Sequence, residues 1–363
     1  MKGLYIHIPF CKRLCTYCDF PKRIGQKEEN INNYINKLIE EIKCTSDNSF
    51  DTVYLGGGTP NSLSLYQLEE ILENIKKTRL KRILEYTIET NYELITLEQV
   101  KLFQKYEINR VSIGVQTLKP CIANTINRVC NYDLLKDKIK MLKDHGITNI
   151  NLDFIFGLPN QTINNVKKDL EMIKELDVAH ISYYSLILED KTVLQHQLDK
   201  KMISLPSDDE TGEMFKLIIK TLKDYGYHHY EISNFSKPGY ESKHNLIYWN
   251  LEEYVGLGMS AASYTNGVRK YNSKLLNNYL KDCDIIKEEI NKEDAMGEYF
   301  WLGLRKIDGV SVSEFKTKFD TDPFEKFDIA KLIDKKLLVV DGDFIKLTDF
   351  GLEHGNYVFS NFI

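Results

Sequence analysis

The chain has 363 residues, with 48 Lys and Arg against 53 Asp and Glu, and a formal net charge of −5. This length can bury a large core, so we expect one large domain and a small one. The negative balance argues against a binding surface for nucleic acid or anionic membranes that spreads over the whole protein.

The cysteine content and the start of the chain indicate the cellular compartment. The seven cysteines are odd in number and three are clustered, which favours a reducing compartment and a metal site over a disulfide framework. No basic and apolar leader opens the chain, and no stretch approaches 18 uninterrupted apolar residues. We expect a cytoplasmic, soluble protein with at most peripheral membrane contact.

Short apolar runs alternate with helical patterns over the first 235 residues. The runs predict strands at 4–8, 52–55, 85–89, 110–114, 149–155 and 180–185. Helices are expected at about 31–42, from 64, from 96, at 133–145 and at 162–176, with capping boxes at Ser64/Gln67 and Thr96/Gln99. Six β–α steps predict a parallel α/β architecture, although periodicity does not distinguish an open sheet from a barrel.

Three cysteines directly follow the first strand, with the spacing C-x3-C-x2-C at Cys11, Cys15 and Cys18. Thiols from one loop can converge on zinc or on an iron–sulfur centre. A four-iron cluster held by three cysteines leaves one iron open to chelate an amine and a carboxylate, as in S-adenosylmethionine. His7 could instead complete a Cys3His zinc site, but no second C-x2-C pair follows, so we favour the open cluster.

This cysteine motif, with Tyr17 before its third cysteine, resembles the radical SAM superfamily. Residues 5–11, YIHIPFC, are similar to the coproporphyrinogen-dehydrogenase-like branch. Oxygen-independent coproporphyrinogen III dehydrogenases of that branch carry another cysteine where this chain has Phe20. The pattern Cys18-Asp19-Phe20 instead resembles the HemW family of heme chaperones. The resemblance implies a partial (β/α)6 TIM-type barrel whose first loop holds a [4Fe-4S] cluster through the three cysteines.

A glycine run, 56–58, followed by Thr59 and Pro60, comes after the second strand. Such a run lets the backbone approach a ligand and aim N–H groups at a carboxylate, although a tight strand-to-helix turn would explain it equally well. Charged and polar residues at later strand ends look ordinary singly. The resemblance implies that the S-adenosylmethionine contacts are Tyr5, Gly57, Gly58, Thr59, Glu89, Gln116, Arg128 and Asp153.

Regular alternation stops after residue 185. Residues 186–206 show no clear period, a helix capped by Ser207 is expected to run to about 225, and 226–235 look strand-like. His244, Tyr248 and Trp249 then form the pattern H-N-x-x-Y-W ahead of an expected turn at 256–258. Such a group is commonly a hydrogen-bonded packing element.

The H-N-x-x-Y-W pattern also resembles the heme-binding motif of the HemW family. The resemblance implies that His244 is the axial heme ligand and that Tyr248 and Trp249 are walls or supports. Many relatives have a histidine where this chain has Ala262, so that residue cannot supply a second ligand here. Met259 is one candidate for that role.

The last seventy residues resemble a small winged-helix-like domain, with helices expected at 295–304, 312–319 and 324–336 and a hairpin with an Asp-Gly turn at 337–347. Residues 300–363 contain nine Lys and Arg against eleven Asp and Glu, which argues against DNA binding. We therefore expect three segments: 1–235, a radical SAM partial barrel; 236–292, a linker with the heme motif; and 293–363, a C-terminal winged-helix-like α+β domain.

Two functions follow from the resemblance. The first is a heme chaperone that binds heme and delivers it to an acceptor hemoprotein of respiration, with the [4Fe-4S] cluster and S-adenosylmethionine in the barrel and no catalytic turnover. The alternative is an oxygen-independent coproporphyrinogen III dehydrogenase that uses a 5′-deoxyadenosyl radical, against which the missing fourth cysteine counts. A zinc-stabilised interaction protein is a third reading, and a homodimer is left open.

Overall fold

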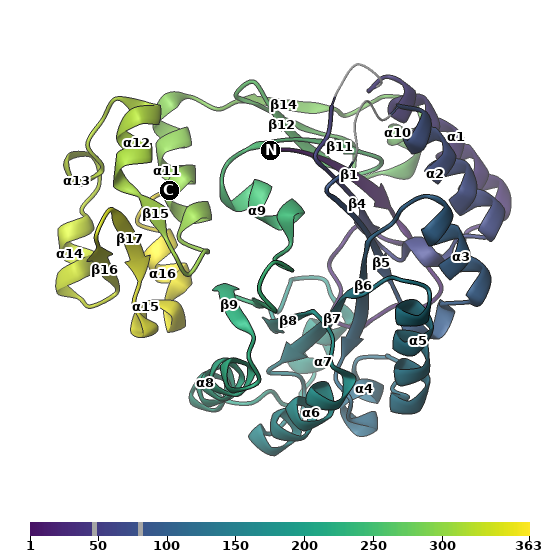
Figure 1. Ribbon diagram of the computed structural model, residues 1–363, viewed down its shortest axis with the longest axis horizontal. Coiled ribbons are helices and arrows are strands. Elements are labelled where there is room, and N and C mark those ends of the chain that lie inside the picture. Colours follow the sequence, from purple (N-terminus) through teal and green to yellow (C-terminus); the bar gives the residue numbers. More distant parts are fainter. Residues whose placement is uncertain (46–48, 79–82) are drawn as a thin grey trace.

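The computed structural model describes residues 1–45, 49–78 and 83–363. Six neighbouring parallel strands form the centre of a 12-stranded sheet (Figure 1), which confirms the predicted α/β architecture. In spatial order they are β1 (Lys2–Ile8), β4 (Thr52–Gly57), β5 (Glu85–Thr90), β6 (Arg110–Gln116), β7 (Asn149–Phe156) and β8 (His180–Ser185).

The main helices cover one face of this sheet (Figure 1): α1 (Glu28–Lys43), α2 (Leu65–Thr78), α3 (Leu97–Lys105), α5 (Tyr132–Asp144), α6 (Ile163–Leu176) and α8 (Asp208–Asp224). Ser64 and Gln67 form the predicted capping box of α2. Thr96 caps α3, but the amide of Gln99 donates to the carbonyl of Asn61 instead of completing a box. The sequence therefore predicted the start of α3 correctly, but the second hydrogen bond of the expected capping box, from the Thr96 N–H to the Gln99 side chain, is replaced by the bond to Asn61.

Each central strand alternates between an apolar and a polar face. In β5, Tyr86 and Ile88 enter the main hydrophobic core. Glu85, Thr87 and Glu89 alternate with them along the strand and face the other way. We call this second face, which also carries the polar residues of β1, β4, β6, β7 and β8, the inner face. A short helix, α9 (Lys243–Trp249), lies over it (Figure 1).

The sheet continues past the parallel strands at both edges. Beside β1 lie β11 (Glu253–Leu257), which is parallel, and then β12 (Ala262–Thr265), β13 (Val268–Tyr271) and β14 (Ile286–Glu289). Beside β8 lie β10 (Asn234–Ser236) and β9 (His228–Glu231). The order is linear, so the described strands form an open sheet whose ends are β14 and β9.

Three local expectations from the sequence were wrong or incomplete. Gly256 and Leu257 belong to β11, so the expected turn is limited to Gly258, whose φ is +97°. The strand-like stretch 226–235 is divided between the two strands β9 and β10. The stretch 186–206 contains a short helix, α7 (Val193–Asp199), capped by Thr192.

The remaining short elements connect these layers. They are β2 (Phe10–Cys11), β3 (Arg23–Ile24), η1 (Pro60–Ser62), η2 (Tyr92–Leu94), α4 (Pro120–Thr125) and α10 (Leu276–Tyr279). No helix in the described ranges has the length and apolar character needed to span a bilayer.

The C-terminal residues form a second hydrophobic core around Phe300 and Phe315. Its elements are α11 (Lys292–Gly303), β15 (Val310–Ser311), α12 (Val312–Phe319), α13 (Pro323–Lys326), α14 (Ile329–Asp334), β16 (Leu338–Asp341), β17 (Phe344–Leu347), α15 (Asp349–Glu353) and α16 (Gly355–Phe359). The expected single helix at 324–336 is therefore two helices, because Asp328 caps a new one. The hairpin is present, and its two loop residues are Gly342 and Asp343.

This C-terminal unit lies between the two ends of the open sheet (Figure 1). Arg269 on β13 forms a bidentate ion pair with Glu298 on α11, with N–O distances of 2.7 and 2.8 Å. At the other end, the backbone N–H of Ile232 donates to the carbonyl of Arg305, and that of Ile307 donates to Tyr230. The unit thus contacts both β13 and the β9–β10 turn, and it closes the gap that the open sheet leaves.

Candidate functional site

The cysteine loop follows β1 at the carboxyl end of the sheet, where parallel α/β folds place their ligands. Cys11 ends β2, and Cys15 and Cys18 follow in the loop; all three thiols are free and partly buried. The loop is held from both sides, because the N–H of Thr16 donates to Ile126 and its carbonyl accepts from Leu194 on α7. The three thiols therefore come from one anchored segment.

Each of the three cysteines has a different polar partner. The Thr59 hydroxyl donates to the Cys11 sulfur at 3.4 Å, and Arg128 Nη1 donates to the Cys15 sulfur at 3.9 Å. The Lys22 ammonium donates to the carbonyl of Cys18. Burial raises the pKa of the Cys11 and Cys18 thiols, and the Lys22 charge acts in the opposite direction on both. Donors and cations of this kind suit thiolates that carry negative charge.

The arrangement bears on the choice between zinc and a larger cluster. Across residues 1–45, 49–78 and 83–363, no three His, Cys, Asp or Glu side chains are arranged to hold a single metal ion. Both ring nitrogens of His7 are engaged, Nδ1 with Tyr5 and Nε2 with the carbonyl of Pro21, each at 2.9 Å. In this conformation His7 is therefore not free to complete a Cys3His site, and three thiols from one loop suit a cluster that takes one thiolate per iron.

The glycine run lies against the cysteine loop. A Cβ on Gly57, whose φ is +106°, would stand 2.4 Å from the His7 ring, and one on Gly58 would stand 3.0 Å from the Cys11 sulfur. The N–H of Gly57 donates to Glu89 at 3.0 Å, and those of Gly58 and Thr59 donate to Ile8 and Phe10. The run is thus required for close packing, and the N–H groups of Gly57, Gly58 and Thr59 bond within the protein, which fits the tight turn that the sequence offered as one of two explanations.

Glu89 lies at the end of β5 and joins two strands of the inner face. Its carboxylate accepts from the Tyr54 hydroxyl at 2.7 Å and from the N–H of Gly57. Burial raises its pKa to about 7, with the nearby charge of Asp153 acting in the same direction and Arg110 against it. Such a group changes its charge near neutral pH.

The other predicted contacts adjoin this group. Asp153 on β7 accepts from Ser112 and Asn151, each at 2.8 Å, and burial raises its pKa. Tyr5 on β1 packs against Tyr54, with 6.1 Å between ring centroids. These residues come from adjacent strands, so the structure brings them onto one continuous surface.

Arg128 and Gln116 meet above β6. A Cβ on Gly114 would stand 2.9 Å from Gln116 Nε2 and 3.2 Å from Arg128 Nη2, so this glycine makes room for both. Arg128 Nη1 donates to Asn91 at 2.8 Å, and Nη2 donates to the carbonyl of Gly114. A ligand carboxylate would have to replace these bonds to be held by both nitrogens.

Sequence reasoning missed Asn91, which connects the two halves of the site. Its side chain accepts from Arg128 and donates to Thr59 at 3.4 Å, so it bridges the cysteine loop and the strand ends. The available signal was its position two residues beyond Glu89, on the same side of the chain.

The H-N-x-x-Y-W residues form α9, whose first N–H groups donate to the buried Glu85. His244 is 1% exposed, with Nδ1 2.7 Å from the Thr52 hydroxyl and Nε2 2.8 Å from the Tyr248 hydroxyl. Burial lowers its pKa to about 3, so the imidazole is neutral. In this conformation His244 is a hydrogen-bonded packing residue, and neither nitrogen is free to bind iron.

The two aromatic residues of the motif lie on different sides of α9. Tyr248 packs edge-on against His244 and Tyr254, with centroids 5.2 and 4.7 Å apart. Trp249 lies beneath the guanidinium of Arg305, which is 4.6 Å from its ring centroid. Met259 is fully buried in the main core, so it does not provide an accessible second ligand.

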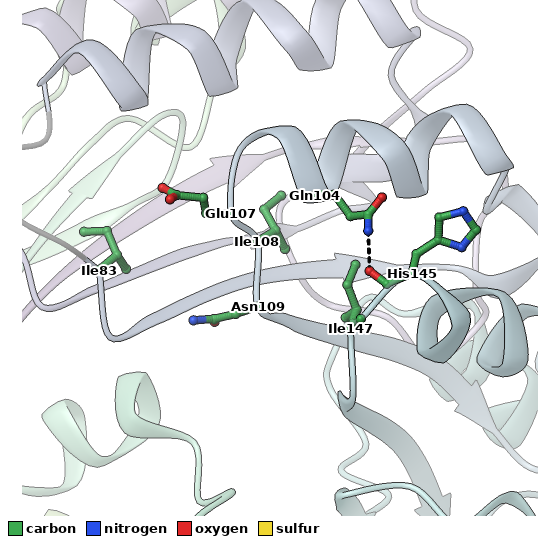
Figure 2. A pocket seen from close by; sticks show the side chains of 8 residues that line it. Ile83, Gln104, Glu107, Ile108, Asn109, His145 and Ile147 are labelled. Carbon is green, nitrogen blue, oxygen red and sulfur yellow. Dashed lines mark hydrogen bonds between the residues drawn. The ribbon is translucent and has the colours of Figure 1, made fainter.

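A surface pocket of about 360 Å³ lies away from these motifs (Figure 2). It is lined by residues that precede β5, β6 and β7, including Ile83, Asn109 and Ile147, and Gln104 donates to the carbonyl of His145 at its rim. The pocket is therefore at the amino ends of the strands, opposite the cysteine loop. It does not contribute to the candidate site.

Comparison with known proteins places the chain in a class. The family model of the radical SAM superfamily matches residues 5–173, and that of the HemN C-terminal domain matches residues 290–354. The first match contains the cysteine loop and the parallel strands up to β7, and the second contains most of the second core. The chain is a radical SAM protein with a HemN-type C-terminal domain.

Relatives of similar length narrow this class. Heme chaperone HemW of Lactococcus lactis is 41% identical over 99% of this chain and 96% of its own length, and HemW of Bacillus subtilis is 35% identical over 100% and 99%. The chain belongs to the HemW family. The solved structure of coproporphyrinogen III oxidase (HemN) from Escherichia coli, a radical SAM enzyme, has the same fold, with a TM-score of 0.87 at 21% identity over 99% of this chain and 89% of that one.

Proposed function

We propose that this protein is a heme chaperone, which binds heme and delivers it to an acceptor hemoprotein of respiration. The observation that carries the proposal is the 41% identity to a HemW heme chaperone over nearly the whole of both chains. Phe20, in place of a fourth cysteine, supports the same choice over a porphyrinogen-oxidising enzyme.

Cys11, Cys15 and Cys18 are proposed to hold a [4Fe-4S] cluster, and the strand-end residues to hold S-adenosylmethionine. When bound, such a cluster supplies an open iron site and a transferable electron. The chain's own residues orient the thiolates and offset their negative charge, because Thr59 donates to the Cys11 sulfur and Arg128 donates to the Cys15 sulfur. Ionised Glu89 and Asp153 can accept from an ammonium or from ribose hydroxyls.

His244 is proposed as the axial heme ligand, with Tyr248 and Trp249 as walls. Binding then requires α9 to leave the inner face, since the imidazole must break its bonds to Thr52 and Tyr248. The helix has only seven residues, and its N-terminus is held by the Glu85 carboxylate. Opening must therefore break these hydrogen bonds and also expose Ile247, which is fully buried.

The decisive experiment is an anaerobic heme titration of the cluster-reconstituted protein, followed by the Soret band. Wild type should bind heme stoichiometrically, and His244→Ala should lose most of this binding. His180→Ala is the matched control, because His180 is equally buried and has both ring nitrogens bonded, to Asn151 and Tyr230. Thermal melts of each variant report whether it is folded.

Three outcomes would overturn the proposal or part of it. Wild type that takes up no heme excludes a heme chaperone. Equal losses in folded His244→Ala and His180→Ala would remove His244 from the site. Formation of protoporphyrinogen from coproporphyrinogen III under reducing, anaerobic conditions would show an enzyme instead.

A further inference from the structure

Arg305 lies where the C-terminal unit faces α9. It follows α11, and its guanidinium carbon is 4.6 Å from the ring centroid of Trp249 and 5.7 Å from that of Phe359. Trp249 is the last residue of α9, and Phe359 is the last of α16. The arginine therefore packs between Trp249 of α9 and Phe359 of α16.

The side chain of Arg305 has no hydrogen-bonding partner among the residues that the structure describes. Its Nε is enclosed without an acceptor, and the indole Nε1 of the adjacent Trp249 is likewise enclosed without one. A guanidinium carries five N–H donors, and the enclosed Nε–H of Arg305 is one that solvent does not reach, so leaving it without an acceptor is costly. An acceptor is missing at this point.

Arg269 shows how this chain satisfies a similarly placed arginine. Its guanidinium also lies over an aromatic ring, 5.5 Å from the centroid of Tyr264. It donates through both terminal nitrogens to the carboxylate of Glu298, at 2.7 and 2.8 Å. A carboxylate is thus the acceptor that this chain supplies to an arginine stacked on an aromatic ring.

Glu231 is the acidic side chain whose charge acts on Arg305, but it does not fill this role. Glu231 is 1% exposed, and its carboxylate accepts from the N–H of Ser233 and the amide of Asn234 without forming an ion pair with Arg305. Burial raises the pKa of Glu231 to about 7, and burial also lowers the pKa of Arg305. Each pKa shift favours the neutral form, so neither charged group is fully stabilised by its surroundings.

We propose that Arg305 binds a propionate carboxylate of the tetrapyrrole, with the ring of Trp249 against the flat macrocycle. The inference rests on the proposed heme binding and adds a specific anion site to it. A planar guanidinium matches both oxygens of a carboxylate, and a tetrapyrrole combines such groups with a large apolar face. The site recognises the edge of the ligand, whereas His244 would recognise its metal.

The test compares heme with heme dimethyl ester, in which both carboxylates are blocked, on cluster-reconstituted full-length protein. Arg305→Gln should weaken heme binding by about tenfold or more, since a charge-assisted pair is lost, and should leave the affinity for the ester unchanged. Arg305→Lys keeps the positive charge but lacks the planar pair of guanidinium donors, so its heme affinity should lie between those of wild type and Arg305→Gln. Arg269→Gln is the matched control and should change neither affinity.

The two ligands separate failure of this inference from failure of the proposed function. If wild type binds neither ligand, heme binding itself is refuted. If it binds both and Arg305→Gln weakens both equally, the arginine has a structural role and the propionate site is refuted. If wild type binds the ester as tightly as heme, no carboxylate is recognised and the site is also refuted.

Discussion

His244 and Tyr248 lie one turn apart on α9, and 2.8 Å separates the imidazole Nε2 from the tyrosine hydroxyl oxygen. This bond occupies the nitrogen that would bind iron, so it stabilises a closed conformation. Tyr248→Phe removes it and should raise the binding-competent population. Because a neutral hydrogen bond contributes about 0.5–1.5 kcal/mol, heme affinity should rise about 2- to 10-fold.

The measurement is the same Soret titration, with the association rate from stopped flow. Tyr254→Phe is the control, since Tyr254 packs against Tyr248 without contacting His244 through its hydroxyl. Weaker heme binding by Tyr248→Phe would mean that the hydroxyl supports the bound state instead of the closed one.

Gly57→Ala should destabilise the cysteine loop. The new Cβ would stand 2.4 Å from the His7 ring on a backbone with φ of +106°. Left-handed strain and overpacking together should cost about 2–5 kcal/mol. Denaturant unfolding and the iron content after reconstitution would both report the loss.

Gly146→Ala is the matched control for this change. Its φ is +80°, but nothing lies within 4 Å of the added Cβ, so only the backbone term of about 1–2 kcal/mol is expected. Equal costs at the two positions would show that the contact with His7 is unimportant.

The sequence predicted the parallel core because local patterns determine it. Short apolar runs marked the strands, and the caps Ser64, Thr96 and Ser207 marked helix starts. By contrast, β11 pairs with β1 across about 250 residues of sequence, and its Gly256 and Leu257 look locally like a turn. Long-range pairing of this kind leaves no short-range signal.

The candidate site was predictable to a similar extent. Parallel strands bring their carboxyl ends together, which explains why Glu89 and Asp153 could be assigned to the same end of the sheet. The sequence allowed His244 to be a hydrogen-bonded packing residue, but its partner Thr52 could not be predicted, because Thr52 is distant in sequence. The bonds of the glycine N–H groups to Ile8 and Phe10 depend on the path of the cysteine loop, which its composition does not specify.

Glu89 should make stability depend on pH. Its pKa is about 7 in the folded chain and near 4.5 when unfolded. The folded state therefore holds an extra proton between these values, and stability from this group falls as pH rises from about 4.5 to 7. Tyr54, Asp153 and Arg110 are the titratable and charged groups that act on it.

Glu89→Gln isolates this effect from other buried acids. Between pH 4.5 and pH 8, the free energy of unfolding of the variant should rise by about 1–3 kcal/mol relative to that of wild type. The reason is that wild type carries a buried charge at the higher pH. Denaturant unfolding at a series of pH values measures the difference. A constant difference across this range would show that Glu89 does not titrate there.

Lys22 should raise the reduction potential of the proposed cluster, because its ammonium lies beside Cys18 and a nearby positive charge favours the more negative, reduced state. Lys22→Met should therefore shift the potential to more negative values, measured by a redox titration followed by electron paramagnetic resonance. Lys12→Met is the matched control, since Lys12 is an exposed lysine of the same loop and its charge is screened by solvent. Equal shifts in the two variants would indicate a general charge effect, and loss of iron from Lys22→Met alone would instead assign Lys22 to holding the loop.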